Sequence, residues 1–147
     1  MRISTRGRYG LRAMVDMACH AEKDPIALRE IAERQGVSES YLEQVYAALR
    51  KAGLVTAQRG AQGGYGLARP ADKITAGDVL RALEGPIAPV HCVDLPASES
   101  CGRMGYCTTR PFWEELRDRI NTFLDGVTLQ DLADRARETG REQMYYI

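Results

Sequence analysis

The stretch IAERQGVSESYLEQVYAALRKAGLV, residues 31–55, decides the fold. Its first part completes an amphipathic helix that begins at Ile26 and stops at Gly36, a residue suited to a left-handed helix end. Ser38 can cap a second helix, which Gly53 closes. The apolar residues that share one face of this second helix are Leu42, Val45, Leu49 and Ala52. Two helices joined by the short turn Gly-Val-Ser are typical of a helix-turn-helix, whose second helix is offered to the DNA major groove.

The residues that follow predict a small β hairpin, or wing. Two strand-like runs, LVTAQ at 54–58 and YGLAR at 65–69, flank the glycine-rich turn RGAQGG. Arg59 opens this turn among small residues, where its guanidinium can reach a phosphate or a narrow minor groove. An arginine beside glycines is also common as a solvated turn residue, but the helix pair directly upstream favours DNA contact.

Polar side chains at the start of the second helix are candidates for reading bases. Ser40 can donate or accept a hydrogen bond, Gln44 can pair with adenine, and Glu43 can accept from a cytosine amine. A carboxylate near phosphates is unfavourable, so we expect Glu43 to sharpen specificity more than affinity; its alternative role is a surface ion pair with Arg50 or Lys51. The candidate DNA-binding residues are Arg2, Ser38, Ser40, Tyr41, Glu43, Gln44, Arg50, Arg59 and Gly60.

Capping signals predict further helices on both sides of this unit. Thr5 is the expected cap of a first helix, and Thr75 with Asp78 has the spacing of a capping box for a short helix that ends at Gly85. The residues expected near one face of the first helix are Tyr9, Met14, Met17 and Ala21. Residues 1–85 are therefore expected to form a winged helix-turn-helix DNA-binding domain.

Residues 111–137 predict a helical arm. Pro111 suits a first helical turn, Thr128 to Asp131 begins one more helix, and residues 138–147 are expected to be a flexible C-terminus. The apolar side of the first arm helix carries Phe112, Leu116, Ile120, Phe123 and Leu124. Such a helix appended to a small winged domain is typical of dimerisation. The expected fold is mainly α with a small β wing: a winged helix-turn-helix domain plus a long dimerisation helix.

Charge is divided along the chain although the net charge is zero. Residues 1–85 carry 13 Lys and Arg against 10 Asp and Glu, whereas residues 86–147 carry 7 against 10. The basic bias of the first half favours a polyanionic partner. No apolar run approaches the roughly 20 residues that cross a bilayer, and the start of the chain lacks the pattern of a secretory signal. We therefore expect a soluble, cytoplasmic protein that does not enter a membrane.

Three of the four cysteines lie in the loop at residues 86–110: Cys92, Cys101 and Cys107. Thiols that stay reduced and cluster in this way more often bind metal or sense redox state than form disulfides. Iron-sulfur ligation suits thiolates on a flexible loop, and zinc and disulfide sensing remain as alternatives. Cys19 is expected to be a small core residue. An enzyme is not expected, because neither histidine, His20 or His91, has a recognisable catalytic context.

The chain resembles the IscR, CymR and NsrR family of bacterial winged-helix regulators. The resemblance extends from Met1 to about Ala136 and is carried by MRISTRGRYGLRAMVDMA, the stretch quoted first, the wing RGAQGGYGLARP and the arm FWEELRDRINTFLDGVTLQDLA. It implies a homodimer that binds double-stranded operator DNA and represses transcription. Members with three loop cysteines bind an iron-sulfur cluster, and a [2Fe-2S] type is the family expectation for this branch; here Cys92, Cys101 and Cys107 match.

One position departs from the family pattern. The iron-sulfur-assembly regulators have a histidine ligand three residues after the last cysteine, where this chain has Arg110, a poor ligand. His91, a residue of the partner subunit or a small thiol are the remaining candidates for a fourth ligand. The expected function is a sensor of iron-sulfur cluster status that controls iron-sulfur assembly genes. The alternatives are a nitric-oxide- or redox-responsive regulator, or a regulator of cysteine metabolism.

Overall fold

The structure, a computed structural model, describes all residues of the chain except 24, 95–100, 104 and 146–147, and the side chains of residues 141–145 also lie outside the description. Six α-helices, three short 3-10 helices and a two-stranded antiparallel sheet form in the described residues. In chain order they are α1 (Thr5–Cys19), η1 (Ala21–Lys23), α2 (Leu28–Gln35), α3 (Glu39–Lys51), β1 (Val55–Gln58), β2 (Gly64–Leu67), η2 (Ala71–Lys73), α4 (Ala76–Glu84), η3 (His91–Val93), α5 (Arg110–Asp125) and α6 (Leu129–Tyr145).

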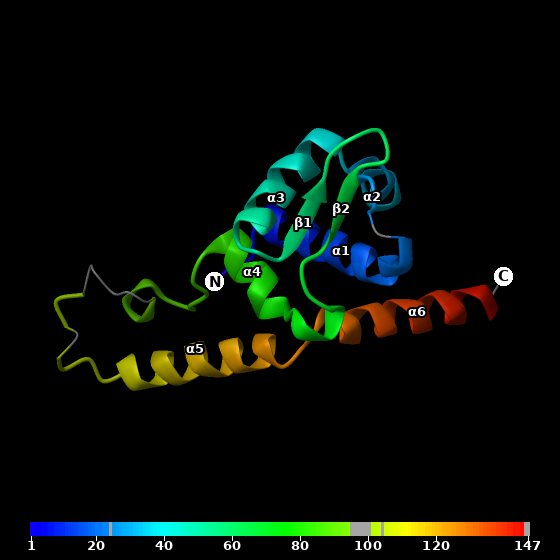
Figure 1. Cartoon of the computed structure of the whole chain (residues 1–147). Helices are drawn as coiled ribbons and strands as arrows, with labels where there is room; N and C mark the ends of the chain where they lie inside the picture. The colour runs from blue at the N-terminus through cyan, green and yellow to red at the C-terminus, as the bar shows by residue number, and fades with distance from the viewer. Residues whose placement is uncertain (24, 95–100, 104, 146–147) are drawn as a thin grey trace.

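A single hydrophobic core joins α1, α2, α3 and α4 into a head that carries the hairpin (Figure 1). The largest side chains in this core are Met14 and Met17 from α1, Ile31 from α2 and Tyr46 from α3, and each is at most 1% exposed. The first turns of α6 complete the core with Leu129 and Ala133. The mainly α fold with a small β wing is therefore confirmed, and the start of α6 belongs to the head.

The wing is attached to the residues in front of α2. β1 and β2 pair from Val55↔Leu67 to Gln58↔Gly64, and the outer side of β2 exchanges two hydrogen bonds with Ile26, N–H to O=C, at 2.9 and 2.8 Å. The apolar spacing predicts a helix from Ile26, but α2 begins at Leu28, because Ile26 is extended and bridges to Tyr65. The second strand is thus held on both edges.

Most predicted helix ends are confirmed and four details change. The capping box of Thr75 and Asp78 is present, and Gly85 ends α4. The cap of α1 is Ser4 and not Thr5, because the Ser4 hydroxyl accepts from the Gly7 N–H. Ala21 and Ala52 are exposed, although the sequence predicts them on the apolar faces of the first helix and of α3. The arm helix begins at Arg110, one residue before Pro111.

The arm consists of α5 and α6, which run nearly end to end along the base of the head (Figure 1). Their junction is fixed to the start of α4: Ala76 N–H donates to the Val127 carbonyl at 2.8 Å, and Leu129 N–H donates to the Ile74 carbonyl at 2.9 Å. No residue of α5 is buried, and its Phe112 and Phe123 are 58% and 67% exposed. The apolar side that the sequence predicts for this helix therefore lacks a partner within the described chain.

The last helix is longer than the sequence suggests. Residues 138–147 are expected to be flexible; α6 continues to Tyr145, and residues 146–147 lie outside the described residues. A reciprocal cap begins this helix, because Thr128 N–H donates to Asp131 and Asp131 N–H donates to the Thr128 hydroxyl, both at 3.0 Å. Hydrogen bonds from the main chain and side chain of Thr128 lower the pKa of the Asp131 carboxyl group. Among the described residues, no helix combines the length and the apolar character that a membrane crossing demands.

Gly64 tests the attachment of the wing. A β-carbon on Gly64 would overlap the main-chain carbonyl of Ile26, so we expect Gly64→Ala to lower the free energy of unfolding by about 2 kcal/mol. The matched control is Gly140→Ala on exposed α6, where nothing lies within 4 Å; it is expected to raise stability by about 0.5–1 kcal/mol. Urea denaturation measures both. Equal effects of the two substitutions would contradict the close approach of β2 to Ile26.

Candidate functional site

The turn between α2 and α3 has the geometry that the sequence predicts. Gly36 takes the left-handed conformation, with φ of 68°, and Val37 N–H donates to the Ala32 carbonyl at 3.1 Å. The Ser38 hydroxyl then accepts from Tyr41 N–H at 3.1 Å and begins α3. The two helices therefore form the expected helix-turn-helix.

The inner face of α3 is locked into the core. Leu42, Val45 and Leu49 are at most 1% exposed, as the apolar spacing predicts. Tyr46, which the sequence reasoning missed, is fully buried and donates its hydroxyl to the Ala13 carbonyl of α1 at 3.2 Å. Burial raises the pKa of Tyr46, so the phenol stays a donor. The direction in which α3 presents its outer face is consequently fixed by α1.

The outer face of α3 is polar and open to solvent. Ser40, Glu43, Gln44 and Arg50 are all exposed. Among the ion pairs of the described chain none involves Glu43, so the alternative pairing with Arg50 or Lys51 is not observed. These side chains are free to meet a ligand.

Two of the candidate DNA-binding residues are already engaged within the head. The Ser38 hydroxyl caps α3, and the half-buried Tyr41 ring packs edge-on against Tyr9 of α1 with centroids 6.3 Å apart. Both lie at the start of α3 and leave only part of their polar surface for a ligand.

The turn of the wing lies at the same end of the head as the start of α3 (Figure 1). Arg59 and Gly60 are exposed, and Gly63 N–H closes the turn on the Gly60 carbonyl at 3.0 Å. Gly60 has φ of 111°, a conformation that side chains rarely adopt. Arg59 makes no ion pair with another described residue. The wing therefore presents an uncompensated positive charge beside the polar face of α3.

Glu84 holds the beginning of the chain against the head. Its carboxylate accepts from Ser4 N–H at 3.2 Å, from Gly7 N–H at 3.1 Å and from the Ser4 hydroxyl. Arg2, the remaining candidate for DNA contact, is exposed two residues before this anchor. The position of Arg2 thus depends on a carboxylate at the far end of α4, which the sequence reasoning did not identify.

A buried carboxylate joins α1 to α2. The side chain of Asp16 is 4% exposed and lies 2.6 Å from Arg34 Nη2, and Gln35 donates to it at 2.8 Å. Hydrogen bonding to Asp16 raises the pKa of Arg34. Sequence reasoning missed this network, although an aspartate inside the apolar run Ala13–Ala18 was an available signal.

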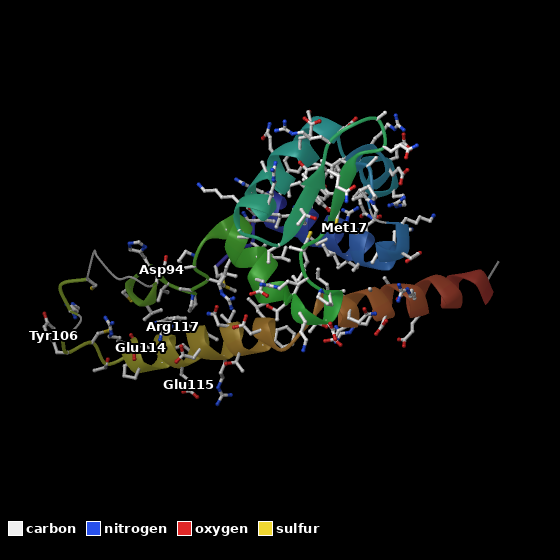
Figure 2. The ribbon with its side chains drawn as sticks, viewed as in Figure 1. Met17, Asp94, Tyr106, Glu114, Glu115 and Arg117 are labelled. Carbon is white, nitrogen blue, oxygen red and sulfur yellow. The ribbon has the colours of Figure 1, made fainter. Side chains whose placement is uncertain are left out.

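The cysteine loop is anchored where it leaves the head. Val93 of η3 is fully buried, and Arg117 of α5 donates to its carbonyl at 3.0 Å. Figure 2 shows Arg117 pointing to the segment that carries Asp94, whereas Glu115 points to the opposite side of α5. Cys92 is half-buried beside this anchor.

The other two loop cysteines lie beyond the anchor. Cys101 is exposed, and Cys107 lies just before α5 with its Sγ 3.4 Å from the Thr109 hydroxyl. Hydrogen bonds from the Thr109 side chain and main chain lower the pKa of Cys107. Arg110 does not replace the missing histidine as a ligand, because its guanidinium pairs with Glu114 at 2.8 Å. His91 is exposed in η3.

The donors of this loop suit an iron-sulfur cluster by their chemistry. All three thiols are free, one has a lowered pKa, and Asp94 adds a buried carboxylate oxygen without a hydrogen-bond partner in the described chain. The described residues nevertheless gather no group of three or more His, Cys, Asp or Glu side chains that could hold a metal. The loop must change shape before Cys92, Cys101 and Cys107 can share one centre.

Comparison with known proteins finds a family profile that matches most of the chain. The profile of the Rrf2 family, described as "Iron-dependent Transcriptional regulator", matches residues 3–135. A transcriptional regulator named CymR from Bacillus subtilis is 43% identical over 149 residues and covers all of both chains. A regulator named IscR from Pectobacterium atrosepticum is 42% identical over 134 residues, which cover 91% of this chain and 80% of the relative.

Two solved structures agree with these matches. The structure of B. subtilis CymR, titled as the global cysteine regulator, matches with a TM-score of 0.74 and 44% sequence identity. The match covers 92% of this chain and 98% of the CymR chain. The structure titled T. potens IscR matches with a TM-score of 0.75 and 43% sequence identity. The match covers 95% of this chain and 90% of the IscR chain. Relatives with two different names are thus equally similar.

The contact between Cys107 and Thr109 predicts a pH dependence. The pKa of the Cys107 thiol lies below its ordinary value of 9.0, so thiolate forms at a lower pH than in a free cysteine. Thr109→Val is expected to raise this pKa, because a hydrogen-bond donor to the sulfur is lost. The rate of iodoacetamide labelling as a function of pH, followed for the Cys107 peptide by mass spectrometry, measures the shift. Thr108→Val, an exposed neighbour, is the control. Identical curves for native protein and Thr109→Val would refute the interaction.

Proposed function

This chain belongs to the Rrf2 family of transcriptional regulators, and from that membership we propose that it is a repressor that binds operator DNA as a homodimer in the cytoplasm. The observation that carries the proposal is the exposed polar face of α3 beside the uncompensated charge of Arg59. In a winged helix-turn-helix this arrangement suits insertion of the helix into a major groove and contact of the wing with the neighbouring backbone or minor groove.

The candidate residues divide into two roles. Gln44 and Glu43, with Ser40, read base edges, because they project from the first turns of α3 into solvent. Arg2, Arg50 and the wing residues Arg59 and Gly60 contact phosphate or sugar and supply affinity without sequence preference. Ser38 and Tyr41 contribute at the helix start, where the cap already orients them.

Dimerisation is assigned to α5. Its exposed Phe112 and Phe123 and its half-buried Leu116, Ile120 and Leu124 lack a buried contact in the described chain. A second copy of the same helix can cover this face in a two-fold arrangement. Two heads then meet two-fold symmetric DNA, with their distance set by the arms.

For the signal, we favour an iron-sulfur cluster held by Cys92, Cys101 and Cys107, which makes the protein a sensor of cluster status that controls iron-sulfur assembly genes. The three thiols, the lowered pKa of Cys107, the description of the family as iron-dependent and the IscR relatives support it. A bound [2Fe-2S] cluster supplies a redox-active centre whose loss a cell can register. Two side chains of α5 anchor the first part of the loop: Arg117 donates to the Val93 carbonyl and Asn121 donates to the Ile87 carbonyl.

Coupling to DNA follows from the elements to which the loop is attached. Cys107 adjoins α5, and Asn121 of the same helix accepts a hydrogen bond from Arg81 of α4 at 3.3 Å. A cluster held by Cys92, Cys101 and Cys107 therefore acts on the joint between head and arm. A shift of population at this joint changes the separation and tilt of the two α3 helices, and with them the sequence preference.

A second candidate is a regulator of cysteine metabolism. CymR from B. subtilis, the global cysteine regulator, matches the whole chain at 43% identity. A nitric-oxide- or redox-responsive regulator, in which the loop thiols themselves respond, is a separate alternative. The two candidates differ in whether iron and sulfide are present in the purified protein.

DNA contact is tested by two substitutions in the head. Arg59→Ala is expected to weaken operator binding by about tenfold and to reduce the slope of log K against log salt by about 0.9, since one phosphate contact is lost. Gln44→Ala is expected to reduce discrimination at one base pair by about 1–3 kcal/mol. Lys23→Ala, an exposed cation in η1, is the control. Fluorescence anisotropy over a salt series measures all three; unchanged affinity and slope for both head variants would exclude this DNA-reading surface.

The cofactor is tested on protein purified without oxygen. The native chain is expected to show visible absorption with iron and sulfide, whereas Cys92→Ala/Cys101→Ala/Cys107→Ala shows neither, and operator affinity or sequence preference differs by about tenfold between the two. Cys19→Ala is the matched control outside the loop. A colourless native protein that cannot be reconstituted, with the same operator affinity as the triple variant, would reject cluster control and favour the second candidate.

A further inference from the structure

A pocket between α1 and α6 is separate from both the DNA-reading face and the cysteine loop. Its volume is 540 Å³, within the range of small-molecule sites. It reaches from Arg8 on α1 to Gln35 at the end of α2 and Thr139 on α6. We propose that this pocket binds a small amphipathic carboxylate, whose apolar chain lies between the two helices and whose charge meets arginines at the rim.

The walls of the pocket are apolar on both helices. Leu11 and Val15 are one turn apart on α1, and Leu132 and Ala136 are one turn apart on α6. None of these four side chains is fully buried, so they leave apolar surface that an alkyl chain can cover. Cys19 also lines the pocket; burial raises the pKa of its thiol, which therefore adds a neutral, apolar contact.

The charges around the pocket favour an anion. Three of its lining residues, Arg8, Arg12 and Arg135, are cationic. The acidic lining residue Asp16 is already occupied by Arg34 and Gln35. Arg12 is held in place because it donates to the side chain and main chain of Gln35, both at 3.1 Å, while Arg135 makes no ion pair with another described residue. A carboxylate at the rim thus meets a preorganised guanidinium and a free one.

The position of the pocket gives the ligand a role. Gln35 lies directly before the turn into α3, and α6 is the second helix of the arm. A molecule that contacts both stabilises one placement of the helix-turn-helix relative to the arm. This second input does not rest on the proposed cluster or on DNA binding, and it can act whether the loop holds metal or not.

The test uses sodium octanoate and the full-length protein. Calorimetry is expected to show saturable binding at one site per chain that tightens about fourfold for each methylene from hexanoate to octanoate. Octanoate is also expected to slow iodoacetamide labelling of Cys19, measured by peptide mass spectrometry, without changing labelling of the exposed Cys101. Uncharged 1-octanol is expected to bind at least fivefold more weakly.

Two variants and one control sharpen this test. Arg135→Gln is expected to weaken octanoate binding about fivefold, whereas Lys23→Gln leaves it unchanged. Ala136→Trp fills the pocket from an exposed position and is expected to abolish binding without lowering Tm. The proposal is overturned if binding does not saturate, if Cys101 is protected equally, or if Arg135→Gln binds like the native protein. A change of oligomeric state in Ala136→Trp would identify the pocket as a contact between chains and also overturn it.

Discussion

The buried carboxylate of Asp16 is the constraint on which the arrangement of the head depends. It is the only charged side chain among the fully buried residues of the described chain, and it is bound by Arg34 and Gln35 at the end of α2. An unpaired charge at this depth is costly, so α2 must stay where its guanidinium reaches α1. Since three residues separate α2 from α3, the same pair also restrains the position of α3. Tyr46 completes the constraint from the other side through its bond to Ala13.

Polar contacts join α5 to α4 of the head, whereas the start of α6 is packed into the hydrophobic core. Arg81 of α4 lies 2.5 Å from Asp125 at the end of α5, and it also donates to Asn121. Because these groups are partly exposed, the joint is weaker than the core and suits a change of angle. The cysteine loop precedes α5, whereas the pocket is lined by α6 at the other end of the arm, so the two proposed ligands would act at separate places on it.

The elements that the sequence predicted well are those whose spacing and capping agree. Ser38, Thr75 and the apolar stripe of α3 determined their helices locally, and the structure confirms them. Ile26 was misassigned because its extended conformation depends on pairing with Tyr65, a contact between residues far apart in the chain. Asp16, Glu84 and the pocket were missed for the same reason, since each acquires its role from a residue on another helix. The three cysteines were found by their proximity in sequence, but spacing alone cannot say how a loop is closed around them.

The pairing of β2 with Ile26 has a consequence for how any signal can be transmitted. Two main-chain hydrogen bonds join the wing to the residue that leads into α2, and the hydrophobic core joins α2 to α3. Main-chain bonds and shared core packing therefore link the wing, α2 and α3, so that a displacement of one of them is resisted by the other two. If the proposed function holds, an effector shifts α3 and the wing together, and regulation is expected to act through the spacing between the two subunits of the proposed dimer.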